Sequence, residues 1–286
     1  MRIIIKDLSF SYNPKAKPVV NTLDNLSLTI EEGEFFGIIG QTGSGKSTLI
    51  QHLNALIPLQ SGSIFVGDFD LSLTDKKSRA RLKELRSKVG MVFQYPEYQL
   101  FAESVYEEVA FAIKNFFPEV SGEELTQRVG DALTAVGLDY NAVKDKSPFD
   151  LSGGQKRRVA IAGVLVANPE ILVLDEPVAG LDPVGKRELM ELLHTLNTNS
   201  RTIIIVSHDM DEVAENCTRV AVMKNGKIVG VGTPAEVFEK TEDRLALPVT
   251  AKIKSTINQM GISFNAPLKI DEFIDELEKV IKQNKN

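Results

Sequence analysis

The stretch GQTGSGKS at positions 40–47 constrains the fold of this chain more than any other part of its sequence. It fits the pattern G-x-x-x-x-G-K-[ST], and it lies between the apolar run EFFGIIG (34–40) and the segment STLIQHLNAL (47–56). A continuous apolar run that ends in glycine is typical of a strand buried on both faces of a sheet, and the leucines of the second segment recur at helical spacing. A strand, a glycine-rich turn and a helix in this order predict an α/β fold.

The same turn predicts a phosphate site. Its glycines let the backbone curl so that successive N–H groups face a phosphate, and the start of the helix adds the positive end of its dipole. In this pattern Lys46 reaches the β- and γ-phosphates of a nucleotide, and the Ser47 hydroxyl binds Mg²⁺. The other candidate nucleotide-binding positions are Gly40, Gln41, Thr42, Gly43, Ser44, Gly45 and Thr48. The alternative interpretation is a glycine-rich turn that binds nothing.

A pair of acids adds the chemistry of hydrolysis. ILVLDEP (171–177) is another buried-strand run, and it ends in Asp175 and Glu176. An Asp at such a strand end can hold Mg²⁺, while the following Glu can orient or deprotonate a water molecule. Acids at a strand end can also simply cap the next element. Together with residues 40–47, this pair indicates nucleotide hydrolysis.

Other elements follow from their patterns. Further strands are expected at Arg2–Ile5, Leu26–Ile30, SIFVGDFDL (63–71) and TIIIVSH (202–208), and a hairpin at AVMKNGKIVGVG (221–232). Residues from about 104 to 168 have a helical pattern. After about residue 235 two amphipathic helices are expected, one on Val249, Ile253, Ile257 and Met260 with Gly261 as its stop, and one on Ile270, Phe273, Ile274, Leu277 and Ile281.

Composition narrows the class of protein. The longest apolar stretches fall short of the roughly 18–20 residues that a bilayer requires, and no signal peptide is evident. The single cysteine, Cys217, fits a reducing cytoplasm, and a net charge of −6 argues against broad binding to nucleic acid. Residues 76–88 carry seven basic side chains against one Glu. We interpret them as a solvated helix face with Leu82 and Leu85 turned inward, rather than as a lipid or nucleic-acid patch.

The N-terminus of a second predicted helix is also suited to bind an anion. LSGGQKRRVAIAG (151–163) places Ser152 and two glycines at the start of an apolar helix, although the chain has one phosphate loop. The motif would make sense if it served the nucleotide of another subunit. Here the sequence resembles the ATP-binding cassette (ABC) family, whose signature is LSGGQ and in which two cassettes close head to tail over two ATP molecules. The resemblance implies that Ser152, Gly153, Gly154 and Gln155 contact ATP held by a facing subunit.

Further landmarks of that family occur in order along the chain. Tyr12 resembles the aromatic residue that stacks on adenine, and Gln94 the glutamine that contacts Mg²⁺ and the attacking water. AGLD (179–182) resembles the loop that touches the facing subunit, and His208 the switch histidine near the γ-phosphate. The resemblance covers about residues 1–240. It implies that Glu176, His208 and Gln94 are catalytic and that Ser47, Gln94 and Asp175 hold Mg²⁺.

The resemblance also implies a fold and its divisions. The expected fold is an α/β, P-loop (RecA-like) ABC nucleotide-binding domain with an N-terminal antiparallel β subdomain, an inserted α-helical subdomain and a small helical C-terminal extension. The ABC ATPase domain would span 1–240, with a RecA-like core at about 1–93 and 165–235 and a helical signature subdomain at about 94–164. Residues 241–286 resemble a C-terminal extension that forms a dimer contact.

Within the family, three stretches resemble the ATPases of energy-coupling factor (ECF) vitamin transporters. They are residues 40–62, FQYPEYQLFAESV (93–105) and residues 151–183. The PE-x-QLF portion is similar to the second ATPase type of a heterodimeric pair, while Gln41 departs from the usual GHTGSGKS. This resemblance implies an ATP-hydrolysing importer subunit, peripheral on the cytoplasmic face of the cell membrane, that powers uptake of vitamins or other micronutrients.

The implied partners are proteins rather than nucleic acid. They are a second ABC ATPase subunit (a paralogue, or a copy of this chain), a transmembrane coupling subunit that docks near Gln94–Glu103, and a membrane subunit that binds the substrate. One alternative is a homodimeric ATPase of a cobalt or nickel importer. Another is an ABC ATPase acting on the ribosome or DNA, which usually carries two cassettes or a long coiled coil.

The stretch after Gln94 is unusually aromatic for a loop. In the docking hypothesis its aromatic residues and the acids Glu97 and Glu103 receive the membrane partner. In the alternative interpretation Tyr98, Leu100 and Phe101 simply pin the loop to the core. The sequence leaves both open for each residue.

Overall fold

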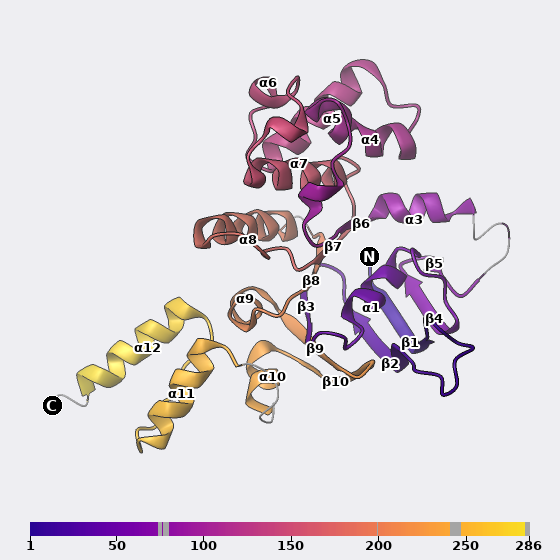
Figure 1. Ribbon diagram of the computed structural model, residues 1–286. Coiled ribbons are helices and arrows are strands. Elements are labelled where there is room, and N and C mark those ends of the chain that lie inside the picture. Colours follow the sequence, from indigo (N-terminus) through magenta and orange to yellow (C-terminus); the bar gives the residue numbers. More distant parts are fainter. Residues whose placement is uncertain (74–75, 77–79, 199, 241–246, 284–286) are drawn as a thin grey trace.

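A computed structural model describes residues 1–73, 76, 80–198, 200–240 and 247–283 (Figure 1). Its centre is a six-stranded sheet in the order β10-β9-β3-β8-β7-β6. Four of the five strand pairings are parallel, and the β9–β10 hairpin is antiparallel. The strands are β3 (Phe35–Gly40), β6 (Val89–Val92), β7 (Ile171–Asp175), β8 (Thr202–Val206), β9 (Arg219–Lys224) and β10 (Lys227–Gly232). The buried strands expected at 34–40, 171–177 and 202–208 and the expected hairpin are confirmed.

The central strand β3 shows why its sequence is apolar throughout. Phe35 and Ile39 belong to a core cluster on one face of the sheet, while Phe36 and Ile38 belong to the cluster on the other face. Every residue of β3, β7 and β8 is buried. Strands covered on both sides have no solvated face, so the alternation of apolar and polar residues disappears.

A second sheet lies at the N-terminal side of the molecule. It is antiparallel, in the order β2-β1-β4-β5, and its strands are β1 (Ile3–Phe10), β2 (Leu23–Ile30), β4 (Ser61–Val66) and β5 (Phe69–Asp70). Helix α1 (Lys46–Leu53) lies between this sheet and the central one, because its Leu49, Ile50 and Leu53 share a core cluster with strands of both sheets (Figure 1).

Helix α1 is shorter than the sequence predicts. The apolar spacing indicates a helix to residue 56, but the helix ends at Leu53, Asn54 is its C-cap, and Ala55 has a left-handed backbone (φ 54°). Leu56 therefore leaves the helical register and is exposed. The expected end of this helix was wrong because the chain turns here to bring its backbone to α3 (Leu82–Lys88), whose Arg86 donates to the carbonyls of Asn54 and Ala55.

A group of helices lies at one end of the molecule, at the top of Figure 1. It contains α4 (Val105–Phe116), α5 (Gly122–Ala135), α6 (Tyr140–Val143) and α7 (Gly153–Leu165), with the 3₁₀ turns η1 (Pro96–Gln99) and η2 (Pro148–Asp150). Apolar residues of α4, α5 and α7 form one continuous core cluster that reaches β3 and β7. The helical pattern expected between about 104 and 168 is confirmed.

The basic stretch at 76–88 is only partly described, since residues 77–79 lie outside the described residues. Within α3, Leu85 is fully buried and Leu82 is half-buried, as the solvated-helix interpretation expects. The basic side chains nevertheless have local partners: the Arg81 guanidinium stacks over the ring of Phe69, and Lys88 pairs with Glu170.

The remaining helices cover the C-terminal part of the chain. They are α8 (Pro183–Asn197), α9 (Met210–Asn216), α10 (Pro234–Lys240), α11 (Val249–Gln259) and α12 (Ile270–Gln283). Two acids of α9 join the last two helices to the domain, because Asp211 accepts from the backbone N–H of Val249 and Glu215 from that of Ile270. Each acid thus lies at a helix N-terminus, where its charge complements the dipole.

Helices α11 and α12 confirm the two amphipathic segments expected after residue 235. Gly261 follows the end of α11 with φ 82°, a left-handed conformation that favours glycine. Phe264 and Phe273 are buried between the two helices, whereas Ile270, Ile274 and Ile281 are about half exposed. The boundary at 240/241 and the dimer contact of this extension stay predictions. In the part of the chain that the structure describes, no helix has the length and apolar character of a membrane span.

Candidate active site

The loop between β3 and α1 is shaped by its glycines. Gly40, Gly43 and Gly45 have φ values of 151°, 81° and 101°. A Cβ on Gly40 would lie 2.2 Å from the carbonyl oxygen of Met223, and a Cβ on Gly45 would lie 2.7 Å from that of Thr22. Only glycine fits these two positions, because the backbone conformation and the space both exclude a side chain.

Lys46 folds back into this loop. Its Nζ donates to the carbonyl oxygens of Gly40 (2.7 Å) and Gln41 (3.1 Å), and the residue is buried. Burial lowers the pKa of the Lys46 ammonium, and the nearby Glu176 and Asp175 carboxylates counteract this by raising it. A buried cation is stabilised by anionic groups around it, so the site favours a ligand rich in negative charge.

Two acids stand at the end of β7. Asp175 is buried, which raises the pKa of its carboxyl, while a hydrogen bond from Ser47 and the charge of Lys46 lower it. Glu176 has a left-handed backbone (φ 51°), a strained conformation for a residue other than glycine and one that occurs preferentially at functional sites. Its Oε2 lies 2.7 Å from Nδ1 of His208, whose side chain is 73% exposed.

These groups line one cavity of about 440 Å³. Its lining residues are Thr22, Thr42, Gly43, Gly45, Lys46, Ser47, Thr48, Gln94, Asp175, Glu176 and His208. The structure thus brings together residues from five separate segments of the sequence. Thr22 is the one that the sequence did not indicate, because it belongs to no motif and reaches the cavity only where β2 packs beside the β9–β10 hairpin.

The donor set of the cavity fits a nucleotide with Mg²⁺. The Ser47 hydroxyl, the Asp175 carboxylate and the Gln94 amide present oxygen atoms, the ligands that Mg²⁺ prefers. The buried Ser44 hydroxyl has no hydrogen-bond partner among the described residues, and it lies in the loop whose amides would face the phosphates. Across the described part of the chain, no group of three or more His, Cys, Asp or Glu side chains is arranged to hold a metal ion.

A buried network supports the backbone around His208. The Ser207 hydroxyl donates to Oε2 of Glu212 (2.8 Å) and accepts from the N–H of Asp209 (3.0 Å). Lys186 pairs with Asp209 at 2.9 Å. Burial raises the pKa of Glu212 to about 7, against the lowering effect of the Ser207 hydrogen bond. The two residues that flank His208 are therefore held by hydrogen bonds while its ring extends into solvent.

Four predicted nucleotide-binding positions, Tyr12, Gly40, Gln41 and Ser44, lie beside this site rather than in its lining. Tyr12 is exposed, its hydroxyl lies 3.2 Å from Oγ1 of Thr48, and its ring meets Phe10 edge-on. Gly40 is buried beneath the loop, and Gln41 is exposed. Tyr12 thus offers an open aromatic face beside the start of α1.

The signature residues lie elsewhere. Ser152 is the N-cap of α7 and forms a capping box with Gln155, in which each side chain accepts from the other residue's backbone N–H. Ser152, Gly153 and Gly154 are exposed. Among the described residues, none of the four signature positions lines the cavity at Lys46.

The stretch after Gln94 divides between the two interpretations. Leu100 is buried and pins the loop to the core, whereas Tyr98 and Phe101 are 84% and 58% exposed. The alternative interpretation is therefore correct for Leu100 and wrong for Tyr98 and Phe101. The carboxylate of Glu97 is largely buried and pairs with Arg157, while Glu103 is exposed.

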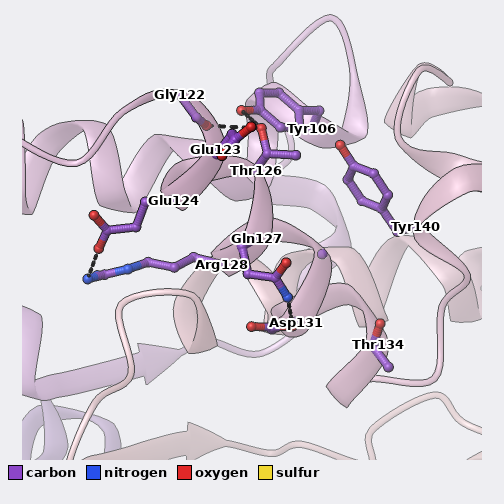
Figure 2. A pocket seen from close by; sticks show the side chains of 11 residues that line it. Tyr106, Gly122, Glu123, Glu124, Thr126, Gln127, Arg128, Asp131, Thr134 and Tyr140 are labelled. Atoms are coloured by element: carbon purple, nitrogen blue, oxygen red, sulfur yellow. Dashed lines mark hydrogen bonds and ion pairs between the residues drawn. The ribbon is translucent and has the colours of Figure 1, made fainter.

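A larger hollow lies on the helical subdomain, over α5 (Figure 2). Its volume is about 1120 Å³, but its polar side chains bind one another: Arg128 donates to Glu124 (2.6 Å) and Gln127 donates to Asp131 (2.8 Å). Such i,i+4 pairs are typical of a solvated helix face. The hollow at the phosphate loop, although smaller, is the one in which unlike functional groups converge.

The chain is similar in sequence to known proteins. A family model described as "ABC transporter" matches residues 23–179. The "Energy-coupling factor transporter ATP-binding protein EcfA2" of Clostridioides difficile (strain 630) is 45% identical over 289 residues, 99% of this chain and 98% of that protein. The protein of the same name from Symbiobacterium thermophilum is 44% identical over 290 residues, 100% of this chain and 98% of that protein.

Two solved structures are also similar. One is cbiO1 from Clostridium perfringens, described as part of the ABC transporter complex cbiONQ; its TM-score is 0.73 at 38% identity, over 91% of this chain and 96% of that one. The other is the dimeric ATP-binding cassette MJ0796 bound to ADP and Pi, with a TM-score of 0.71 at 30% identity, over 81% of this chain and 98% of that one. These matches confirm the expected resemblance and the α/β fold of an ABC nucleotide-binding domain. The chain belongs to the ABC transporter family, among the ATP-binding proteins of energy-coupling factor transporters, which hydrolyse ATP to drive transport.

Proposed function

We propose that this chain forms two half-sites of an ECF-type importer, one for its own ATP and one for the ATP of a facing ATPase subunit. The observation that carries the proposal is the separation of the two halves. Lys46, Asp175 and Glu176 line one cavity, while the start of α7 is exposed and contributes no residue to that lining. An active site divided in this way is complete only when two subunits meet.

The residues of the cavity suit distinct roles. Bound MgATP supplies the phosphoryl group that is transferred and a cation that neutralises its charge. Lys46 contacts the β- and γ-phosphates, and Ser47, Gln94 and Asp175 hold the cation. Glu176 orients or deprotonates the attacking water, and His208, 2.7 Å from its carboxylate, contacts the γ-phosphate. Tyr12 stacks on the adenine beside α1.

The glycines of the signature support a ligand outside the chain. A Cβ on Gly153 or on Gly154 would meet no atom of the described residues within 4 Å, so the fold of this chain does not require glycine at either position. Glycine also serves where the backbone must approach a ligand closely. We assign that ligand as the γ-phosphate of ATP on the facing subunit, with Ser152 and Gln155 beside it. The similar cassette MJ0796 is dimeric and bound to ADP and Pi.

The exposed aromatic residues after Gln94 support a docking site for a transmembrane coupling subunit. Tyr95, Tyr98, Phe101 and Phe111 are all exposed, and the rings of Phe101 and Phe111 pack edge-on at 4.9 Å. Exposed aromatic side chains in a group mark interaction surfaces. Docking here would hold the chain at the cytoplasmic face of the membrane as a peripheral subunit, beside a second membrane subunit that binds the vitamin or other micronutrient.

Two arrangements of the ATPase pair are open to experiment. The similarity to EcfA2 proteins favours pairing with a paralogous ATPase, while the similarity to cbiO1 favours two copies of one chain, as a cobalt or nickel importer would use. Mass spectrometry of the intact complex, extracted from membranes in mild detergent, distinguishes them. We expect one copy of this chain, one paralogue and integral membrane subunits. Recovery with ribosomes in a salt-sensitive form would contradict the transport function.

Glu103 tests the docking site. Because Glu97 is paired with Arg157, the exposed acid at this site is Glu103, and Glu103→Lys should reduce the yield of assembled complex about fivefold through lost charge complementarity. ATP binding by the chain should stay unchanged. Glu119→Lys, at another exposed acid between α4 and α5, is the matched control. Equal assembly of both variants would remove the acid from the docking hypothesis and leave the aromatic residues.

A further inference from the structure

One buried arginine links three segments that are distant in the sequence. Arg157, in the second turn of α7, is almost fully buried. Its Nε lies 3.2 Å from Oε2 of Glu97 and its Nη2 lies 3.4 Å from Oε1, so both carboxylate oxygens are engaged. Its Nη1 donates to the carbonyl oxygen of Ala179 at 2.9 Å. The guanidinium thus joins the signature helix to the turn η1 and to the loop 179–182.

The contacts of Arg157 with Glu97 and Ala179 depend on the geometry of the guanidinium group, and no other side chain reproduces that geometry. A guanidinium presents its donors in a rigid fork that matches a carboxylate on one edge and leaves Nη1 for a second acceptor. Lysine carries the same charge on a flexible stem and lacks this fork. Glu97 is only 18% exposed, so removing either partner leaves a largely buried charge without compensation.

A second contact joins the same two segments. Gly180 has φ 76°, and a Cβ at this position would lie 3.4 Å from Cε1 of Tyr95, so the Tyr95 ring packs directly against the glycine. Tyr95 itself has a left-handed backbone, which starts η1. Tyr95 and Glu97, on either side of Pro96, therefore both hold the loop 179–182. Tyr95 does so through its aromatic ring, and Glu97 does so through Arg157.

The loop 179–182 is in turn bonded to the residue proposed to act on water. The N–H of Ala179 donates to the carbonyl oxygen of Glu176 at 3.1 Å, while the carbonyl of Ala179 accepts from Arg157. A single peptide segment thus connects the guanidinium with the backbone of Glu176. That backbone is strained at φ 51°, a conformation that persists only where surrounding contacts over-determine it.

We infer that Arg157 is a positioning residue for Glu176, and that the path from Glu97 through Arg157 and Ala179 carries the state of the docking segment to the catalytic carboxylate. This inference rests on the proposed function, because it takes Glu176 as the residue that orients water and 94–103 as the docking segment. The hydrogen bonds that the described residues form with the Arg157 side chain come from Glu97 and Ala179, which do not line the cavity, so Arg157 acts through the 176–179 turn.

The test is steady-state ATP hydrolysis by the purified complex of this chain with its membrane partners. Arg157→Gln should lower kcat about tenfold and leave KM for ATP within about twofold, since the nucleotide-binding residues are untouched. Glu97→Gln, which keeps the bond from Arg157 to Ala179, should lower kcat by a smaller factor. Arg128→Gln removes an exposed arginine from an ion pair on α5 and should leave both parameters unchanged.

A double-mutant cycle separates positioning from a general structural role. If Arg157 works through Glu176, Arg157→Gln should change the residual turnover of a Glu176→Gln complex by less than about twofold. Loss by the same factor in both backgrounds, or an unchanged kcat in the single variant, would overturn the inference. Should Arg157→Gln not assemble, Arg157→Lys enters the same cycle with its charge retained. Hydrolysis by the wild-type complex tests the proposed function separately.

Discussion

Glycines lie at the N-termini of both α1 and α7, where a helix dipole suits an anion, yet the surroundings of the two helix starts differ. At the start of α1, Ser44, Gly45 and Lys46 are buried, Lys46 folds back onto the loop, and two carboxylates at the end of β7 line the same cavity. At the start of α7 the backbone is exposed, and the capping groups are Ser152 and Gln155 of the same turn. The first helix start is enclosed by this chain, and the second is presented outward.

The space around one glycine at each helix start shows how the two helix starts differ. At Gly45 a Cβ would lie 2.7 Å from a backbone carbonyl, and at Gly154 it would meet nothing within 4 Å among the described residues. One glycine is therefore required by folding and the other is not. A helix N-terminus attracts anions in both cases, but only the groups opposite it decide whether hydrolysis can occur there.

The largest change is expected at the enclosed site. Glu176→Gln removes the group that orients or deprotonates water while keeping its shape, so turnover should fall about 10³-fold. ATP binding, measured by equilibrium dialysis, should stay within about threefold, because Lys46 and the loop amides are unchanged. Full turnover in this variant would end the assignment of Glu176 and with it the contrast between the two helix starts.

The second prediction concerns folding. Gly45→Ala forces a left-handed backbone (φ 101°) on a residue with a side chain and places that Cβ against the Thr22 carbonyl. It should lower the free energy of unfolding by about 3 to 4 kcal/mol and abolish ATP binding. Chemical denaturation of the chain measures the first effect. A stable Gly45→Ala variant would show that the loop tolerates another conformation.

The third prediction concerns the buried network beside His208, at the enclosed site. Burial raises the pKa of Glu212 to about 7 from its ordinary value of 4.5, so the folded state binds this proton more tightly than the unfolded state. Below about pH 4.5 the raised pKa adds about 3 kcal/mol to the free energy of unfolding. This contribution decreases as the pH rises above about 4.5 and is lost as the pH passes through about 7.

Glu212→Gln is neutral at every pH and should lack this slope. The difference in unfolding free energy between the variant and the wild type should therefore grow in favour of the variant between pH 5 and pH 8. Exposed carboxylates contribute equally to the unfolding free energies of the variant and the wild type, so their contributions cancel in the difference. Glu123→Gln, an exposed acid at the start of α5, is the control and should differ from the wild type by a constant. A constant difference for Glu212→Gln would contradict the raised pKa.

Much of the enclosed site could be predicted from the sequence, because it is built from short contiguous patterns. The strands β3, β7 and β8 are apolar runs, and the residues that line the cavity, apart from Thr22 and Gln94, lie at or shortly after the ends of these strands. Pairs between distant segments could not be predicted. Arg157 and Glu97 are 60 positions apart, and their partnership depends on how α7 packs on η1.

The burial of a single polar side chain could not be predicted from the sequence either. The acids after His208 are typical of a helix N-terminus, and Asp209 caps α9 accordingly. Nothing in the local pattern marks Glu212 as the buried member of that group, because its burial depends on which face of a short helix the sheet covers. The early end of α1 has a similar cause, since a tertiary contact from Arg86 competes with helical spacing.

The smallest effect is expected from a substitution at the exposed start of α7. This substitution should raise the stability of the chain and lower the activity of the complex. Gly154→Ala adds a methyl group to open space in the first turn of α7, so the free energy of unfolding should rise by about 0.5 to 1 kcal/mol through the greater helix propensity of alanine. The same methyl group lies where the backbone would approach the facing nucleotide, and hydrolysis by the assembled complex should fall about tenfold.

Denaturation of the isolated chain and hydrolysis by the complex measure the two effects separately. Binding of ATP to the chain alone should not change, because the cavity at Lys46 is lined by other residues. Serine 152 provides a matched comparison, since Ser152→Ala removes the N-cap and should lower stability by about 1 kcal/mol as well as activity. If Gly154→Ala is as active as the wild type, nothing outside the chain approaches this backbone, and the exposed helix start is a structural end of α7 rather than half of a site.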